Sequence, residues 1–139
     1  MTVAQVIYGG SPVAYSGNFE VTLLSSAERT CDVHSGDQQN HYSRGVAVAL
    51  DVTAISGSPS LTLSIEWKTP LGEYVKLLEA TTPVTAVSHH VYVVYPGIAA
   101  AAAGIEQVAG FPLPYGWRVS VAHATADAVT YAVTASLLQ

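Results

Sequence analysis

Two long runs of alternating apolar residues constrain the fold of this chain more than any other feature. In each run an apolar side chain stands at every second position: first Val46, Val48, Leu50 and Val52, then Leu61, Leu63, Ile65 and Trp67. Alternation with period two is typical of a β-strand with one buried face, and the branched side chains of Val, Ile and Thr favour an extended backbone. The alternation predicts a sheet protein.

Turn residues separate these two runs. Ser56-Gly57-Ser58-Pro59 combines a glycine with a proline, which predicts that the chain reverses there and that the two strands pair as an antiparallel hairpin. The end of the chain repeats the pattern, because residues 117–123 and 131–137 alternate on either side of a turn at 124–127. We therefore expect a second hairpin, in which Trp117 is in phase with Val119 and Val121 on the core face.

The remaining segments are shorter and are separated by turn residues. Further strands are predicted over 19–24, 28–34, 73–79 and 86–95, with a solvent loop over 35–43 and a long loop with one helical turn over 98–110. Strand 28–34 contains Cys31, which we expect to be half-buried. Eight or nine strands without a long helix predict an all-β, single-domain antiparallel β-sandwich of jelly-roll-like type over 19–139. It is preceded by an N-terminal arm, residues 1–18, in which we expect one short strand.

Composition indicates an assembly. Half of the 139 residues are hydrophobic and only 11% are charged, whereas about 25% is typical of a soluble domain. No run approaches the roughly 18 apolar residues of a membrane-spanning helix, so we expect no membrane partner. The outer faces must then be rich in Ala, Ser, Thr and Val, and we expect part of that surface to pack against other subunits.

Charge and cysteine content exclude several classes of function. The net charge is −5, and the basic residues are scattered along the chain: Arg29, Arg44, Lys68, Lys76 and Arg118. Nucleic-acid binding needs a concentrated basic surface, so we expect no nucleic-acid partner. The segment MTVAQVIYGG lacks the pattern of a secretory signal, which predicts synthesis in the cytoplasm. A single cysteine cannot form an internal disulfide.

Several polar residues could carry chemistry, but none forms a specific motif. His34, Asp37 and His41 lie in one polar stretch and could bind a divalent metal with help from His89 or His90. Neighbouring histidines on a strand point to opposite faces, so at most one of that pair could contribute. Isolated loop histidines are common without a metal, and we predict no metal site.

Enzymatic activity is not expected either. Glu66 and Glu73 could approach each other across the turn at Pro70, as in a glycosidase, but Lys68 and Lys76 are equally close and favour a solvated charge ladder. There is no nucleophile elbow, phosphate-binding glycine loop or dinucleotide fingerprint. We predict no catalytic residues and no cofactor.

The aromatic residues suggest interfaces. Eight tyrosines accompany only two phenylalanines, and tyrosine and tryptophan favour protein interfaces and sugar-stacking platforms. The candidates for a sugar platform are Trp67, Tyr74 and Tyr115. Trp67 is in phase with the apolar face of its strand, which favours a core position and weakens the carbohydrate interpretation.

The N-terminal arm is a candidate subunit contact. Its apolar residues are Val3, Val6, Ile7 and Tyr8, and the turn residues that follow them leave little room to join the main sheets. An apolar segment of this kind can add a strand to an exposed sheet edge of a partner. We expect these four residues to link subunits.

Beyond these patterns, residues 45–138 resemble a known family. DVTAISGSPSLTLSIEWKTPLGEYVKLLEA, VYPGI with its Ala-rich continuation, and LPYGWRVSVAHATADAVTYAVTASL resemble small virion proteins of tailed bacteriophages. The resemblance implies a non-enzymatic virion structural protein, most specifically a capsid decoration (cement) protein. It also implies binding to the major capsid protein on the outer capsid surface, as a homotrimer. The alternative function is a carbohydrate-binding or tail and host-adhesion module.

Overall fold

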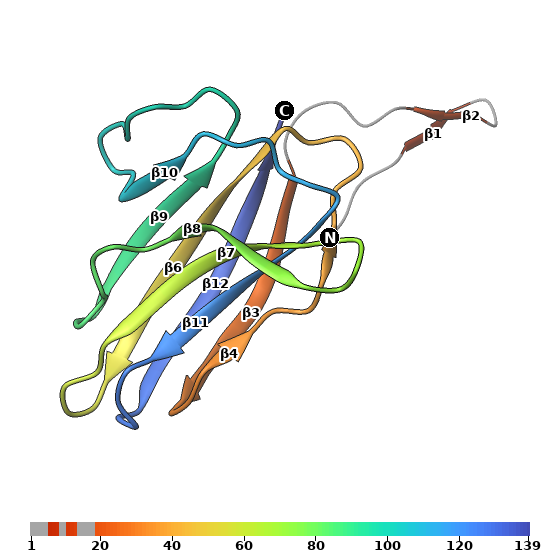
Figure 1. Ribbon diagram of the computed structural model, residues 1–139. Helices are drawn as coiled ribbons and strands as arrows, with labels where there is room; N and C mark the ends of the chain where they lie inside the picture. The colour runs from red at the N-terminus through yellow and green to blue at the C-terminus, as the bar shows by residue number, and fades with distance from the viewer. Residues whose placement is uncertain (1–5, 9–10, 14–18) are drawn as a thin grey trace.

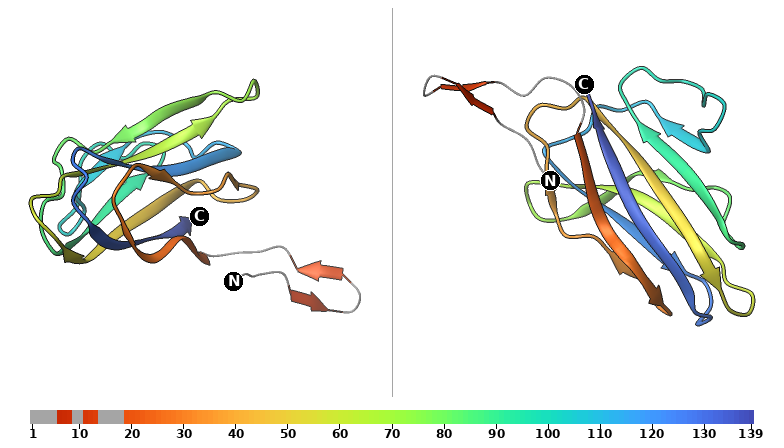
Figure 2. Two further views of the ribbon diagram at one scale, coloured as in Figure 1. Left: turned by 90° about the horizontal axis from the view of Figure 1, so that it is seen from below. Right: turned by 180° about the vertical axis from the view of Figure 1, so that it is seen from behind.

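The computed structural model describes residues 6–8, 11–13 and 19–139, and every regular element in that part is a β-strand. Sheet I contains, in spatial order, β10 (Gln107–Ala109), β9 (Ser88–Val94), β6 (Gly45–Ile55), β12 (Val129–Leu138) and β3 (Phe19–Arg29). Sheet II contains β4 (Val33–His34), β11 (Gly116–His123), β7 (Leu61–Lys68) and β8 (Tyr74–Glu79), and β5 (Gln38–Gln39) also pairs with β11. The two sheets lie face to face (Figures 1 and 2).

The strand order is that of a jelly roll. Without the short β5 and β10, sheet I reads β3-β12-β6-β9 and sheet II reads β4-β11-β7-β8, so the first long strand lies beside the last. This confirms the predicted all-β, single-domain β-sandwich. In the described residues the two sheets hold ten strands, more than predicted, because β5 and β10 form within segments expected to be loops. One pair, β10 with β9, is parallel.

Both predicted hairpins are wrong. β6 pairs with β9 and β12 in sheet I, whereas β7 pairs with β8 and β11 in sheet II. β11 and β12 likewise lie in different sheets and do not pair with each other. The chain crosses from one sheet to the other at residues 56–60 and again at 124–128. A hairpin and a crossing give the same alternating sequence, since both point the apolar side chains of the two strands into one core.

The two crossings lie side by side and are hydrogen-bonded to each other. Ser56 N donates to Ala128 O at 2.9 Å, Ala124 N donates to Ser60 O at 3.0 Å, and Ser58 N donates to the Asp127 carboxylate at 3.0 Å. Within residues 19–139, β7 and β8 are the consecutive long strands that do form a hairpin, through the predicted turn at 69–72.

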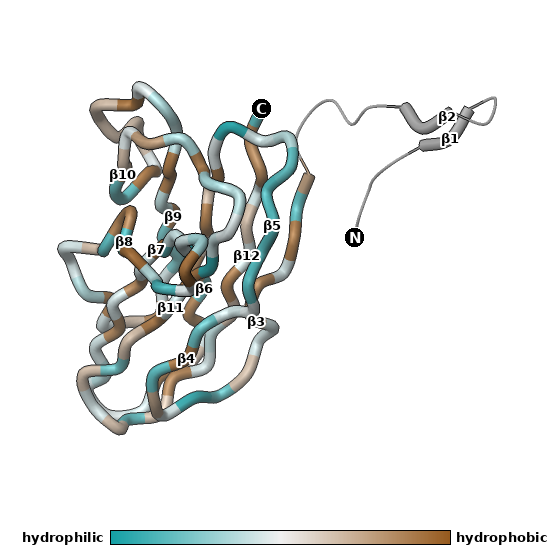
Figure 3. The backbone as a smooth tube through the Cα atoms, turned by 45° about the vertical axis from the view of Figure 1, so that its right-hand side comes forward, coloured by the Kyte–Doolittle hydropathy of each residue, from teal (hydrophilic) through white to brown (hydrophobic). Residues whose placement is uncertain are grey.

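The core lies between the sheets and contains the predicted apolar faces. Side chains from both sheets are fully or almost fully buried: Val46, Val48, Leu50, Val52, Leu61, Leu63, Ile65, Trp117, Val119, Val121, Tyr131, Val133, Ala135 and Leu137. Figure 3 shows the corresponding alternation of hydrophobic and hydrophilic residues along the strands. Trp117 is buried as expected, while Trp67, directly opposite it on β7, is only half-buried.

Three local expectations need correction. Cys31 is exposed and lies at a bend between β3 and β4, because β3 continues to Arg29 and the chain then crosses to sheet II. The polar stretch 35–43 is not a free loop, since Ser35 and Ser43 are buried and β5 pairs with β11. The segment 98–110 has no helical turn and ends in β10.

The arm contains two short strands where one was predicted. β1 (Val6–Tyr8) and β2 (Ser11–Val13) pair antiparallel with each other and belong to neither five-stranded sheet. Val3 lies outside the described residues. In the part of the chain that the structure describes, no helix is long and apolar enough to cross a bilayer.

Candidate functional site

The outer face of sheet I is lined by small uncharged side chains. Ala47 and Ala49 of β6 lie between Val93 and Val91 of β9 on one side and the β12 hydroxyl residues Ser136 and Thr134 on the other. Its charged residues include Glu20 on the edge strand β3 and Asp51 on the central strand β6. The part of the face around Ala47 and Ala49 carries no charge, so it can approach another protein surface with little cost of desolvation.

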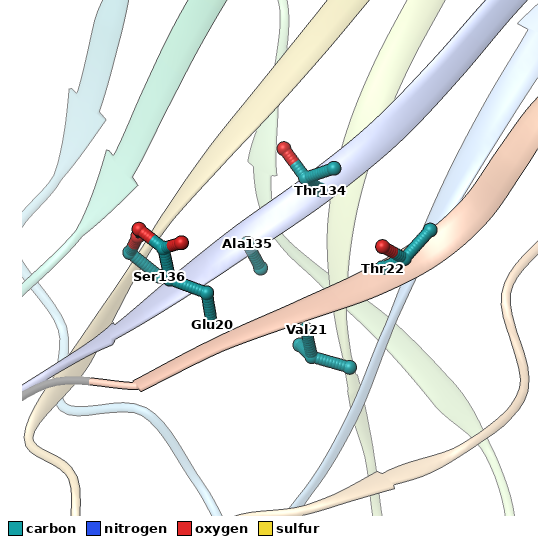
Figure 4. A pocket seen from close by; sticks show the side chains of 6 residues that line it. All are labelled: Glu20, Val21, Thr22, Thr134, Ala135 and Ser136. Atoms are coloured by element: carbon teal, nitrogen blue, oxygen red, sulfur yellow. The ribbon is translucent and has the colours of Figure 1, made fainter. Parts of the chain in front are cut away.

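A shallow hollow lies on this face between β3 and β12 (Figure 4). It holds about 260 Å³ and is lined by Glu20, Val21, Thr22, Thr134, Ala135 and Ser136. Ser136 Oγ donates to Glu20 Oε2 at 3.2 Å, and the β3–β12 register shifts close by, between Val133 and Thr134. The lining offers hydroxyl groups and one carboxylate but no cation, so it suits hydroxyl or amide groups and not phosphate.

The outer face of sheet II carries an ionic network instead. Asp37 accepts a hydrogen bond from Lys68 Nζ at 2.7 Å and another from the Tyr74 hydroxyl at 2.8 Å. Both hydrogen bonds lower the pKa of Asp37, and the one from Lys68 has the larger effect. Asp37 in turn raises the pKa values of Lys68 and Tyr74. Beside them, Arg118 Nε donates to Glu66 Oε1 at 2.7 Å.

This network includes one residue proposed for a sugar platform, Tyr74, and one member of the proposed carboxylate pair, Glu66. The Arg118 guanidinium lies 3.4 Å from the centroid of the Tyr74 ring and covers that face. Glu66 is buried beneath its partner Arg118, whereas Glu73 lies exposed in the β7–β8 turn. The charge-ladder interpretation is therefore closer to the structure than a glycosidase pair, although the partner of Glu66 is Arg118 and not a lysine.

The five residues considered as metal ligands lie in different environments. Asp37 is bonded within the ionic network, His34 Nδ1 donates to Ser35 O at 3.0 Å, and the His41 ring packs edge-on against Tyr115 at 5.4 Å. His89 is exposed on the strand face opposite to that of His90. Among the residues that the structure describes, no three His, Cys, Asp or Glu side chains converge on one point.

A chain of hydrogen bonds at the start of β9 was not foreseen from the sequence. Ser88 Oγ lies 2.9 Å from His90 Nε2, and His90 Nδ1 lies 3.1 Å from Glu106 Oε1, which is the order of groups in a hydrolase triad. The sequence spacing of Ser88 and His90 indicates that they share a strand face, but the approach of Glu106 depends on the pairing of β9 with β10.

The surroundings of this serine do not fit catalysis. The Ser88 hydroxyl also lies 2.9 Å from Ala86 O, so its proton is shared between that carbonyl and His90. The hollow of Figure 4 lies on β3 and β12, and β6 separates these strands from β9. We assign the three residues a structural role, in which they attach β9 to the segment that precedes β10.

A second polar cluster joins the sheets near their crossings. His123 of β11 and Tyr131 of β12 meet at 2.8 Å between His123 Nε2 and the Tyr131 hydroxyl, and His123 N donates to Asp32 at 2.6 Å. Burial lowers the pKa of His123 and raises the pKa of Tyr131 to about 12. Arg29 packs over the Tyr131 ring at 4.6 Å. The cluster is well suited to connecting the two layers.

The predicted subunit contacts of the arm are only partly described. Val6, Ile7 and Tyr8 form β1, and their backbone partners are Val13, Pro12 and Ser11 of β2. Val3 lies outside the described residues. The contact between subunits stays a prediction.

Comparison with known proteins finds a likeness of fold alone. No protein-family model and no curated protein matches the sequence. A chain in the structure of infectious bursal disease virus, Gx strain, is similar with a TM-score of 0.52 and 9% identity, over 97% of this chain and 37% of that chain. A chain from the Gt strain gives a TM-score of 0.45 and 6% identity, over 99% of this chain and 38% of that chain. This chain thus spans well under half the length of either.

Proposed function

We propose that this chain is a non-enzymatic structural protein of a virus particle. The observation that carries the proposal is the outer face of sheet I, where small uncharged side chains surround Ala47 and Ala49. The fold shared with a chain of infectious bursal disease virus supports a virion role. Jelly rolls also occur in lectins and other proteins, so the fold alone does not indicate the function, and the proposal rests on the surface.

More specifically, we propose a capsid decoration protein of a tailed bacteriophage. The resemblance of residues 45–138 to small phage virion proteins supports this assignment. The protein would be made in the host cytoplasm and would bind the major capsid protein on the outer capsid surface as a homotrimer, since three-fold positions on a shell favour trimers. The face of sheet I would lie against the shell.

Co-sedimentation with expanded capsids that lack the protein tests this proposal. We expect wild type to bind in a fixed ratio to the major capsid protein, and Ala49→Arg to lose most of the binding, because it places a charge at the centre of the sheet I face. Thr62→Arg is the matched control, since Thr62 lies on the outer face of sheet II between the buried Leu61 and Leu63. Absence of binding by wild type, or equal losses in both variants, would refute the proposal.

The proposed arm contacts belong to the same assembly. Val3, Val6, Ile7 and Tyr8 would add backbone hydrogen bonds between neighbouring subunits, and such bonds do not depend on the few charges of this protein. The pairing of β1 with β2 outside both sheets is compatible with an element that is used between subunits.

A carbohydrate-binding module is the second candidate. It is favoured by Tyr115, which is 57% exposed, and by the neighbouring Tyr42. The Tyr74 ring is covered by Arg118, and Trp67 is half-buried, so neither offers an open platform. A specific glycan-array signal that Tyr115→Ala abolishes, with the melting temperature unchanged, would rank this function above capsid binding.

A further inference from the structure

Exposed large apolar side chains gather at one end of the sandwich. We call this the loop end; it consists of residues 40–44, 69–73 and 111–116, which adjoin the start of β6, the β7–β8 turn and the start of β11. It carries Leu71, 90% exposed, together with Tyr42, Phe111 and Tyr115. Figure 1 shows these connections on the same side of the molecule.

Backbone contacts place the three segments beside one another. Asn40 N donates to Tyr115 O at 2.7 Å, which joins the first segment to the third. A Cβ atom added at Gly116 would lie 3.2 Å from Lys68 O, so the third segment runs directly along the residue that precedes the β7–β8 turn. The loop end is therefore one continuous surface.

This surface is rigidly built. The Asn40 side-chain amide donates to Ser43 O at 2.8 Å and to Leu113 O at 2.9 Å, and its oxygen accepts from Ser43 N at 2.9 Å. Both Ser43 and Leu113 are buried, and His41 packs between Tyr42 and Tyr115. Side chains held in place before binding lose little entropy when a partner docks.

The loop end also carries one unpaired charge of each sign. Within residues 19–139, the other four basic side chains are occupied: Arg29 by backbone carbonyls, Lys68 by Asp37, Lys76 by Glu79 and Arg118 by Glu66. Arg44 is exposed, and its guanidinium has no partner in this part of the chain. Glu73 is exposed in the neighbouring turn, and its carboxylate likewise has none among these residues.

We propose that the loop end binds the loop end of a second copy of this chain, with Arg44 of each copy paired to Glu73 of the next and the exposed aromatic residues and Leu71 packed between them. Tyrosine and arginine are the residues that most often dominate protein interfaces. A surface with both charges and an apolar centre can pair with a rotated copy of itself, and such contacts form a closed ring when the rotation closes. The inference rests on the proposed self-assembly and not on capsid binding.

Charge reversal in the full-length chain tests this pairing. Arg44→Glu and Glu73→Arg each place like charges together in the interface, so each should raise the dissociation constant measured by sedimentation velocity about tenfold or more. The double variant restores opposite charges in every contact, so it should return the dissociation constant to near the wild-type value.

Glu28→Arg is the matched control. Glu28 is an exposed carboxylate near the last residue of β3, away from the loop end, so its replacement should leave association unchanged. Circular dichroism melts of every variant report whether the fold is kept. An oligomer that both single variants preserve, or single-variant defects that the double variant fails to repair, would overturn the loop-end pairing while self-assembly stands. A wild-type chain that stays monomeric at all concentrations would refute the self-assembly itself, and capsid binding would be judged separately by co-sedimentation.

Discussion

Trp117 is the largest fully buried side chain among the described residues, and it belongs to the hydrophobic core. Its indole Nε1 has no hydrogen-bond partner in this part of the chain. Replacing a buried tryptophan by alanine typically costs about 3 to 5 kcal/mol, a large share of the roughly 5 to 15 kcal/mol that stabilises a domain. We expect Trp117→Ala to unfold the protein or lower its urea midpoint severely.

Trp117→Phe separates packing from hydrogen bonding at the same position. Because no hydrogen bond is lost, it should cost clearly less than the alanine variant, about 1 to 2 kcal/mol for the smaller ring. Equal losses in the two variants would show that the indole N–H, and not the ring volume, matters at this site.

His123 should make stability depend on pH. Burial lowers its pKa below the ordinary value of 6.5, Arg29 adds to the effect and Asp32 opposes it. The unfolded chain then binds more protons than the folded chain below about pH 6.5, so this histidine's contribution to stability is complete above that pH and is lost as the pH falls. The melting temperature of wild type should drop more between pH 7.5 and pH 5 than that of His123→Gln. His89→Gln, at an exposed position, should follow wild type, and parallel curves for all three proteins would contradict this assignment.

At the scale of elements, the crossing at Gly57 should tolerate no side chain. Gly57 has φ of +71°, and an added Cβ atom would lie 2.6 Å from Asp127 Oδ1. Gly72 has φ of +92° but open space around it, so Gly72→Ala measures the backbone cost alone, about 1 to 2 kcal/mol. Gly57→Ala should cost more than Gly72→Ala in urea unfolding, and adding Asp127→Ala should recover part of the difference.

The elements also show how far the sequence could predict the fold. Alternation in β6, β7, β11 and β12 correctly indicated which side chains face the core, because burial acts on each strand separately. It could not indicate the sheet in which each strand pairs, since an apolar face looks the same from either layer. The turn residues predicted a reversal, and the reversal is a crossing fixed by contacts such as Asp127 with Ser58, which are 69 residues apart.

The candidate sites were harder to predict for a related reason. The sequence indicated Tyr115 as a candidate exposed ring and indicated that Glu66 would be paired. It gave no sign that Arg118 covers Tyr74 or that Glu106 reaches His90, because these contacts depend on strand register and on loop paths. Spacing along one strand indicated which of its residues share a face. It could not indicate which residues of other strands they contact.

At the scale of the whole molecule, deleting residues 1–18 separates the arm from the sandwich. Both five-stranded sheets are built from residues 19–139, so the truncated protein should keep its β-type circular dichroism and a cooperative melt. If the arm links subunits, oligomers and capsid binding should weaken. Full association by the truncated protein would refute the linking role, and loss of the β signal would show that the arm belongs to the core.

The two outer faces of the sandwich differ in their charges. Sheet I presents small uncharged side chains around Ala47 and Ala49, while sheet II presents paired charges that are already satisfied within the chain. The loop end lies at the edge of both faces. In the proposed assembly, the loop end would meet neighbouring subunits and sheet I would lie against the shell, while sheet II would face water.

A cryo-electron microscopy reconstruction of expanded capsids incubated with the full-length protein tests this account most directly. We predict added density on the outer surface at symmetry-related positions, into which copies of the jelly roll fit with sheet I towards the shell. Capsids that remain bare after incubation at saturating protein, or density with sheet II against the shell, would contradict it.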